Sequence, residues 1–129
     1  MDITLSILSF LLIIFSGVSE AIMDKLNFHF EKSIFSNEKY KQIFWNPIES
    51  WKNKWKEDLK TERFLGSSTI FVFTTDAWHL FKFFRNTSLF IGLGLLGFIS
   101  YNPIIMVIIA RVLYGLSFTL LFDKILVKK

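Results

Sequence analysis

A single apolar run near the start of the chain restricts its fold more than any other feature. Residues 3–23 contain one charged side chain, Glu20, and the run has the roughly 20 residues that a helix needs to cross about 30 Å of hydrocarbon. Residues 16–19 (Ser-Gly-Val-Ser) also resemble the cleavage region of a signal peptide. No positive charge precedes the run, so the sequence favours a retained membrane-spanning helix.

Three further apolar runs follow, at residues 64–84, 87–101 and 104–122. Asn102 precedes Pro103, and this step separates the last two runs because a residue before proline is biased away from the helix. We therefore predict an all-α, polytopic integral membrane protein with about four transmembrane helices, a basic tail at 123–129 and a single membrane domain over 1–129. The run at 87–101 has only 15 residues, so a count of three spans stays open.

The composition excludes several other classes of protein. Hydrophobic residues make up 52% of the 129 residues and charged residues 20%, which is too little charge to cover a small soluble domain. The same proportions exclude intrinsic disorder. The chain has no cysteine, which excludes disulfides and cysteine-based metal sites. Its excess of four basic residues does not indicate nucleic-acid binding in so apolar a chain.

A charged and aromatic connector, residues 24–63, separates the first two runs and holds nine Lys or Arg and seven Asp or Glu. From Pro47 onward, apolar side chains recur every three or four residues, which is the spacing of one helical face. Trp favours the headgroup level of a membrane and Lys favours anionic lipid. We predict an interfacial amphipathic helix over residues 47–60; an ordinary helix packed on its own protein is the alternative. The predicted lipid-interface residues are Trp45, Trp51, Lys52, Lys54, Trp55 and Lys56.

The distribution of Lys and Arg bears on the orientation in the membrane. With four spans the connector lies opposite both termini, and it carries nine basic residues where the other side carries five. This count favours a cytoplasmic connector in a cytoplasmic-type membrane. The C-terminal lysines are also typical of a cytoplasmic tail, and this points the other way.

Two pairs of ionisable side chains in or beside the predicted spans are candidates for chemistry, because such groups are costly in a bilayer and often functional. Glu20 and Asp24 are four residues apart on one helical face, where like charges repel unless a cation or proton is shared. Asp76 and His79 have the spacing of the Glu-x-x-His ligand pairs of helical bundles. Together the four residues predict a catalytic site for one divalent metal: zinc, manganese, iron or magnesium. Such a metal would activate water for attack on a lipid ester or phosphate.

A purely structural interpretation of the same residues stays open. Asp76 and His79 would bond each other or Lys82 in a polar network, and Glu20 and Asp24 would lie in headgroup water. Asp76 is about 12 residues, or roughly 18 Å, beyond the start of the second run, whereas Glu20 lies near the membrane surface where that run begins. Passage of protons or ions along these groups is a further alternative.

Three glycines match the G-x-G-x-x-G pattern without predicting a dinucleotide site. Gly92, Gly94 and Gly97 lie in an apolar run, whereas the motif needs a preceding strand and an acidic residue about 20 positions later. Small residues instead allow close approach of helices in lipid, so these three glycines and Gly115 are predicted helix-packing positions.

Charged side chains inside the predicted spans need partners. The predicted intramembrane charges are Asp76, Lys82 and Arg111. Arg111 lies about eight residues into the last run. It would pair with Asp76 or Glu20, extend toward the surface, or contact an anion or lipid headgroup.

Three functions from different classes fit these observations. The one we favour is a small structural or assembly subunit that acts through helix–helix and lipid contacts, because four short helices bury little interior for an active site. The second is a membrane-embedded metal-dependent hydrolase that uses Glu20, Asp24, Asp76 and His79. The third is a holin-like or channel-forming oligomer. The expected partners are membrane lipids and either copies of this chain or other membrane proteins, and we expect no nucleic acid and no dinucleotide.

Overall fold

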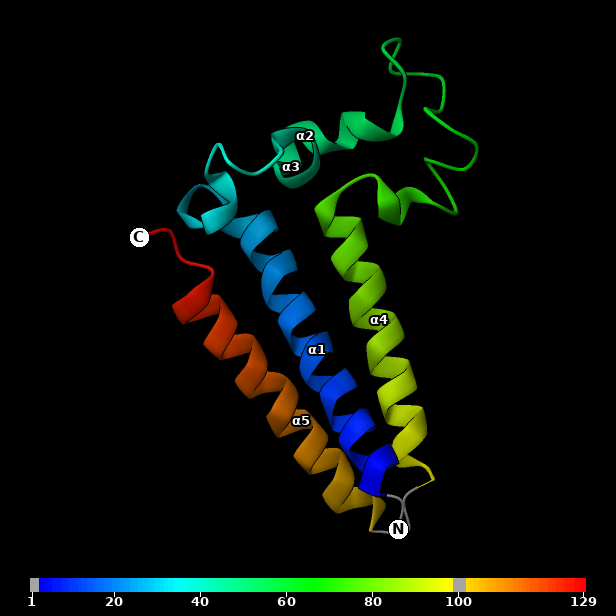
Figure 1. The fold of residues 1–129 in the computed structure, drawn as a ribbon, viewed down its shortest axis with the longest axis vertical. Coiled ribbons are helices and arrows are strands. Elements are labelled where there is room, and N and C mark those ends of the chain that lie inside the picture. The colour runs from blue at the N-terminus through cyan, green and yellow to red at the C-terminus, as the bar shows by residue number, and fades with distance from the viewer. Residues whose placement is uncertain (1–2, 99–101) are drawn as a thin grey trace.

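The computed structural model describes residues 3–98 and 102–129, and within these residues the chain is all-helical with no named strand. Its long helices are α1 (Ile3–Phe28), α4 (Ala77–Leu96) and α5 (Pro103–Leu120), and a π-helical turn, η5 (Leu121–Ile125), continues α5. Figure 1 shows α1 lying between α4 and α5, with α4 running opposite to α1 and α5 running in the same direction as α1.

Short helices lie across the end of the bundle at which α1 ends and α4 begins (Figure 1). We call residues 29–76, which contain them, the cap. The short elements of the cap are η1 (Phe30–Lys32), η2 (Ile34–Ser36), α2 (Gln42–Trp45), α3 (Pro47–Ser50), η3 (Trp51–Lys54) and η4 (Val72–Thr74).

Two of the long helices could span a membrane. The segments Ile3–Phe28 and Pro103–Ile125 are long and apolar enough to do so, and α4 is not among the segments that meet both conditions. The all-α part of the fold prediction is therefore confirmed, and a membrane location is supported in part. The predicted count of about four spans is not confirmed.

The structure divides the second and third apolar runs differently from the prediction. Residues 64–76 form turns and the single 3-10 turn η4, and α4 begins only at Ala77. Asp76 sets this boundary, because its side chain caps α4 by accepting a hydrogen bond from the His79 amide at 2.9 Å. The predicted break after residue 84 lies inside α4, so a single helix covers residues 77–96, where parts of two helices were expected. The last three residues of the segment predicted at 87–101 lie outside the described residues.

The hydrophobic core consists of two clusters at different heights in the bundle. The cluster next to the cap joins α1 and α4 to the cap and the tail, and its buried members are Ala21, Ile22, Leu26, Phe30, Phe35, Ala77 and Leu126. The cluster at the opposite end joins α1, α4 and α5, and its buried members are Ile13, Leu96, Met106 and Ala110. Backbone hydrogen bonds fix the tail to the cap, from the Ile34 amide to Leu126 and from the Lys128 amide to Lys32.

Small side chains on α1 let its two neighbours approach closely. A Cβ placed on Gly17 would lie 2.2 Å from Ser117 Oγ and 2.4 Å from the Tyr114 carbonyl oxygen, so α5 passes directly over this glycine. Ser9 Oγ donates to the Gly92 carbonyl of α4 at 2.7 Å.

The predicted packing glycines differ in their surroundings. A Cβ on Gly92 would lie 3.0–3.3 Å from atoms of α1, so this residue packs against another long helix. A Cβ on Gly94 would meet nothing within 4 Å, and those on Gly97 and Gly115 would meet only atoms of their own helix or its end.

The predicted amphipathic helix over residues 47–60 is shorter in the structure. α3 and η3 end at Lys54, and Trp55 then pairs with Glu62 in an isolated β-bridge. The Trp45 ring is partly buried against the core cluster next to the cap and stacks on Phe35 with centroids 4.4 Å apart. Trp51 is 45% exposed.

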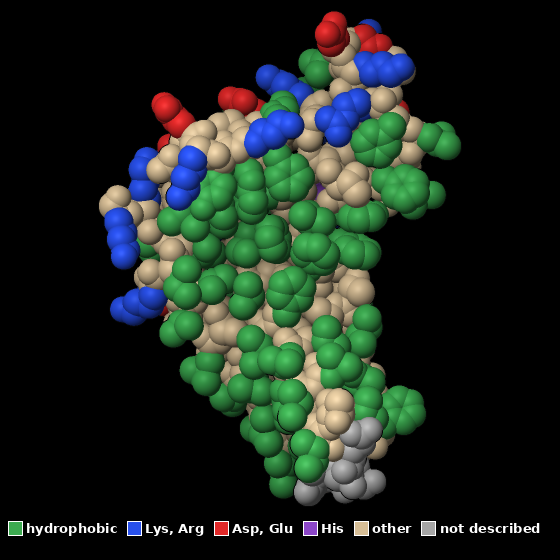
Figure 2. All heavy atoms as spheres, viewed as in Figure 1, with side chains coloured by type: hydrophobic (Ala, Val, Ile, Leu, Met, Phe, Trp, Pro, Cys, Tyr) green, Lys and Arg blue, Asp and Glu red, His purple; other side chains and the backbone are tan. Residues whose placement is uncertain are grey.

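Hydrophobic and charged side chains lie on different parts of the molecular surface. Figure 2 shows hydrophobic side chains over the length of the bundle and Lys, Arg, Asp and Glu side chains gathered over the cap and its edge. Lys52 and Lys54 lie over the Trp51 and Trp55 rings, with centroid distances of 5.9 and 5.8 Å. The charged side chains therefore lie mostly at one end of the molecule and the apolar side chains along the helices.

Candidate functional site

Asp76 and His79 form a close pair at the start of α4. The Asp76 Oδ2 atom lies 2.7 Å from His79 Nδ1, and Oδ1 accepts from the His79 backbone amide at 2.9 Å. Asp76 is only 3% exposed, whereas one third of the His79 side chain is exposed at 33%. One carboxylate therefore caps the helix and holds the imidazole ring at the same time.

The cap holds the residue before this pair in place. Asn53, at the end of η3, donates from Nδ2 to the Thr75 carbonyl at 2.5 Å, and its Oδ1 accepts from Arg63. Thr75 is fully buried, and its hydroxyl donates to the Val72 carbonyl at 2.7 Å. Asn53 lies within the amphipathic helix predicted over residues 47–60, and no pattern in the sequence indicates this role.

A cavity of about 160 Å³ opens beside the pair, between the end of α1, the short helix α3 and the first turn of α4. Its lining residues are Asn27, Pro47, Ser50, Trp51, Asp76, Trp78 and His79. The Trp78 Nε1 atom is buried and, in the part of the chain that the structure describes, has no hydrogen-bond partner. A buried donor without an acceptor is costly, so a bound acceptor, such as a water or a ligand oxygen, would stabilise this site.

The geometry of the pair determines what it can do chemically. A carboxylate only accepts hydrogen bonds, so the proton between the two side chains belongs to His79 Nδ1. In the neutral ring, Nε2 is then an acceptor, available to a ligand proton or a metal. This arrangement is suited to a general base or to a single metal ligand.

The four residues of the predicted metal site do not come together. Glu20 instead pairs with Arg85 of α4, with 2.5 Å between Oε2 and Nη1. Among residues 3–98 and 102–129, no group of three or more His, Cys, Asp or Glu side chains is placed to hold a metal ion. Asp76 and His79 thus form one pair, and Glu20 and Asp24 belong to a different part of the bundle.

Arg85 was missed because the sequence analysis placed it in a loop. It lies within α4, and its carbonyl oxygen accepts from Ser16 Oγ at 2.9 Å. The Glu20–Arg85 pair therefore lies in a polar layer between the two hydrophobic clusters and joins α1 to α4.

The other predicted intramembrane charges also have different surroundings. Lys82 lies over the Trp78 ring, 4.8 Å from its centroid. Arg111 pairs with neither Asp76 nor Glu20, because the ion pairs found among the described residues are His79–Asp76 and Arg85–Glu20.

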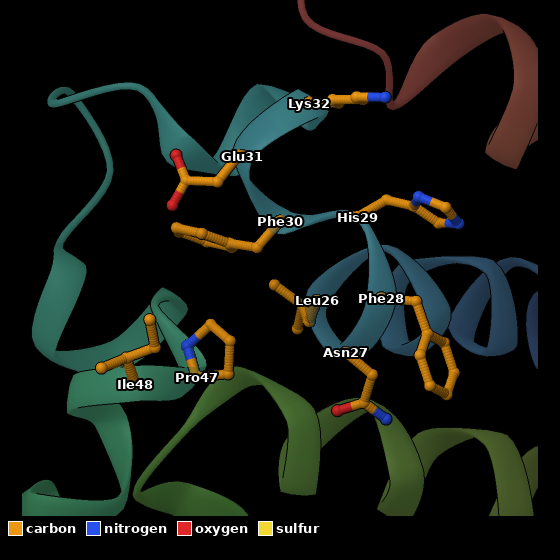
Figure 3. Close-up of a pocket in the computed structure, with 9 residues that line it drawn as sticks. All are labelled: Leu26, Asn27, Phe28, His29, Phe30, Glu31, Lys32, Pro47 and Ile48. Atoms are coloured by element: carbon orange, nitrogen blue, oxygen red, sulfur yellow. The ribbon is translucent and has the colours of Figure 1, made fainter.

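A second hollow, of about 330 Å³, lies where α1 ends against the cap. In Figure 3 the side chains of Leu26, Phe30 and Pro47 turn toward one another, whereas His29 and Lys32 point away from them. The His29 ring meets Phe122 edge-on at a centroid distance of 5.4 Å. This hollow has an apolar floor and brings no acid–base pair together.

Comparison with known proteins finds no family model, no curated protein and no solved structure that matches this chain. The fold itself defines the class: an all-helical protein with two helices that could span a membrane.

Proposed function

We propose that this chain is a small integral membrane protein that acts as a structural or assembly subunit through helix–helix and lipid contacts. The observation that carries the proposal is the uncovered apolar surface of α5 and η5. Only 11% of the most apolar part of Pro103–Ile125 is buried, against 44% for Ile3–Phe28. A surface this apolar needs lipid or another helix to cover it.

We further propose that α4 is a third span. It has 20 residues, about 30 Å of helix, and it lies along α1 for its length (Figure 1). Its charged side chains, Lys82 and Arg85, lie in the half nearest the cap, and its other half carries exposed apolar side chains such as Phe90 and Ile91. The Glu20–Arg85 pair neutralises the deeper of the two charges.

Three spans give a simple orientation. The cap and the tail then lie on one side of the membrane, and the sequence between α4 and α5 contains no Lys or Arg. The basic residues outside α1, α4 and α5 are all on the cap side, and they are Lys32, Lys39, Lys41, Lys52, Lys54, Lys56, Lys60, Arg63, Lys124, Lys128 and Lys129. Cytoplasmic loops carry such an excess, which favours a cytoplasmic cap.

Extraction and cross-linking of membranes test the proposed function. We expect the protein to stay in the membrane pellet in alkaline carbonate and to cross-link in the native membrane to a copy of itself or to another membrane protein. Release by carbonate, or an uncross-linked monomer in intact membranes, would contradict it. Dye release from liposomes that depends on the protein would instead favour the channel-forming alternative.

The Asp76–His79 pair favours a second candidate, a hydrolase acting on a lipid ester where the cap meets the bundle. Its support is the base-like geometry of the pair and the adjacent cavity of about 160 Å³. Asp76→Asn keeps the helix cap and removes the charge beside His79, so we expect it to lower hydrolysis of a short-chain lipid ester as strongly as His79→Gln. Metal analysis of the purified protein would separate a metal-dependent form of this activity from a metal-free one.

A further inference from the structure

A groove of about 360 Å³ runs between α4 and α5 on one side of α1. Its floor is Ile13 of α1, and side chains of the two outer helices form its walls. The lining residues are Ile13, Leu89, Leu93, Val107, Ala110, Arg111 and Tyr114. The inference that follows rests on the proposed function, because the groove faces lipid only if the three helices span a membrane.

Arg111 places a charge in this groove near the middle of the span. It is eight residues beyond Pro103, about 12 Å along the helix. A Cβ on Gly115 would lie 3.1 Å from Arg111 Nη1, so the guanidinium extends roughly one further turn toward the cap. The segment Pro103–Ile125 has 23 residues, about 34 Å of helix, and the charge therefore lies close to its midpoint.

The direction of the Arg111 side chain argues against a lipid phosphate as its partner. The nearer membrane surface is at the Pro103 end of the helix, and a snorkelling side chain would extend that way. Arg111 extends toward Gly115 and the centre of the span instead. Headgroup phosphates of both leaflets are therefore distant from the guanidinium.

The chain itself supplies no free carboxylate at this depth. Within residues 3–98 and 102–129, Arg111 belongs to neither of the two ion pairs, and its residue is exposed. Glu20 is held by Arg85, and Asp24 lies one helical turn closer to the cap on α1. A second copy would bring the same carboxylates at the same heights, so it does not offer Arg111 a new partner.

We propose that the groove between α4 and α5 receives a transmembrane helix of another protein, and that an Asp or Glu on that helix pairs with Arg111. The small residue Gly115 beside Arg111 is only partly buried and allows a helix to come close. An exposed charge at mid-span with no counter-ion is costly in hydrocarbon, and a carboxylate brought by a partner removes that cost. This identifies the partner by its chemistry: a spanning helix with one acidic residue near its centre.

The test uses purified protein in phosphatidylcholine liposomes and two synthetic probes, Leu-rich spanning peptides with a single Glu or a single Gln at the central position. A central position reaches Arg111 in either peptide orientation. Association is measured by energy transfer between labelled protein and labelled peptide. We expect the Glu peptide to bind at least tenfold more tightly than the Gln peptide. Arg111→Gln should abolish this preference, and the matched control Lys82→Gln should keep it.

A further variant and the other possible results identify what occupies the groove. Val107→Trp narrows the groove and leaves Arg111 in place, so it should weaken binding of the Glu peptide. Equal binding of both peptides to the unmodified protein, or a preference that survives Arg111→Gln, overturns the proposal. Energy transfer between two copies of the protein that requires Arg111 would assign the groove to a second copy. A preference lost when phosphatidylglycerol is added would assign Arg111 to lipid phosphate.

The proposal and the proposed function fail in different ways. A protein that carbonate releases from the liposomes is not membrane-spanning, and this result would contradict the proposed function. A protein that stays inserted but does not distinguish the Glu peptide from the Gln peptide contradicts the pairing at Arg111 alone.

Discussion

The Glu20–Arg85 pair shows how one residue contact can join two helices of the bundle. The two side chains are 24% and 26% exposed, and they lie between hydrophobic clusters. Removing one partner of this partly buried pair leaves the other charge without its counter-ion, at a cost of about 1–3 kcal/mol. The contact therefore matters more for keeping α1 and α4 together than for its own net attraction.

We predict that Arg85→Gln lowers the free energy of unfolding by about 1–3 kcal/mol, because it leaves the Glu20 carboxylate without its cationic partner. The double variant Glu20→Gln/Arg85→Gln should lose less than the sum of the two single variants. Unfolding in mixed detergent micelles, followed by Trp fluorescence, measures both effects. The control Lys56→Gln, in the exposed cap, should change the free energy by less than about 0.5 kcal/mol. If the stability loss of the double variant equals the sum of the losses in the two single variants, Glu20 and Arg85 do not interact directly.

Gly17 gives a second prediction at the scale of single residues. In Gly17→Ala the new Cβ would meet the Tyr114 carbonyl at 2.4 Å, and a backbone atom cannot rotate away, so α1 and α5 must separate. We expect a loss of about 1–3 kcal/mol in unfolding free energy. The matched control Gly94→Ala, with nothing within 4 Å, should be neutral or more stable by up to about 1 kcal/mol. Equal effects at the two positions would contradict the observed packing of α5 on α1.

Elements were predictable from the sequence where hydropathy alone determines them. The run at 3–23 and the run at 104–122 correspond to α1 and to α5 with η5, because each contains a single charged residue and no proline. Residues 64–76 are also apolar, yet they form a loop. Hydrogen bonds from backbone amides to a carboxylate fix that loop, and an average of hydropathy values contains no information about such contacts.

Particular residues explain why the loop replaces a helix. The Glu62 carboxylate accepts from the Gly66 and Ser68 amides at 2.9 and 3.0 Å, and Gly66 has a left-handed φ of 80°. Asp76 could have been recognised as a helix cap, because Asp is preferred at that position. Its pairing with His79 was predicted from their spacing, whereas the contribution of Asn53 depends on a contact 22 residues away along the chain.

The same cap loop makes a prediction about acid. Hydrogen bonds from the Thr61 hydroxyl and the Thr61 and Lys60 amides lower the pKa of Asp58 to about 2. Hydrogen bonds from Ser68 and Gly66 likewise lower the pKa of Glu62. A carboxyl group with a lowered pKa stabilises the folded loop above its ordinary pKa, near 4, and this contribution is lost as the pH falls toward 2.

We therefore expect the loop at residues 55–68 to loosen between about pH 4 and pH 2 while the bundle stays folded. Carboxyl-carbon NMR should show Asp58 titrating near 2. Thr61→Val removes the hydroxyl donor and should move the pKa of Asp58 toward its ordinary value. An unchanged titration in Thr61→Val would contradict this explanation.

At the scale of the whole molecule, the count of long helices decides the topology. Four apolar runs, each taken as a span, would put basic residues on both sides of the membrane and leave the orientation ambiguous. If α4 is one span where two were predicted, the number of spans before the tail falls by one. The tail then lies on the opposite side of the membrane from the side that four spans predict. All the basic residues outside the long helices then gather at the cap. The proposed orientation therefore depends on the helix boundaries.

The central claim is that α1, α4 and α5 are three spans beneath a cytoplasmic cap. The chain has no cysteine, so a single cysteine introduced by substitution is the one thiol that can be labelled. The most direct measurement labels Glu57→Cys, Phe98→Cys and Lys128→Cys with a membrane-impermeant maleimide in sealed inside-out vesicles. The account predicts labelling at positions 57 and 128 at once, and at position 98 only after the vesicles are permeabilised. Labelling of positions 57 and 98 from the same side, as two or four spans require, would contradict it.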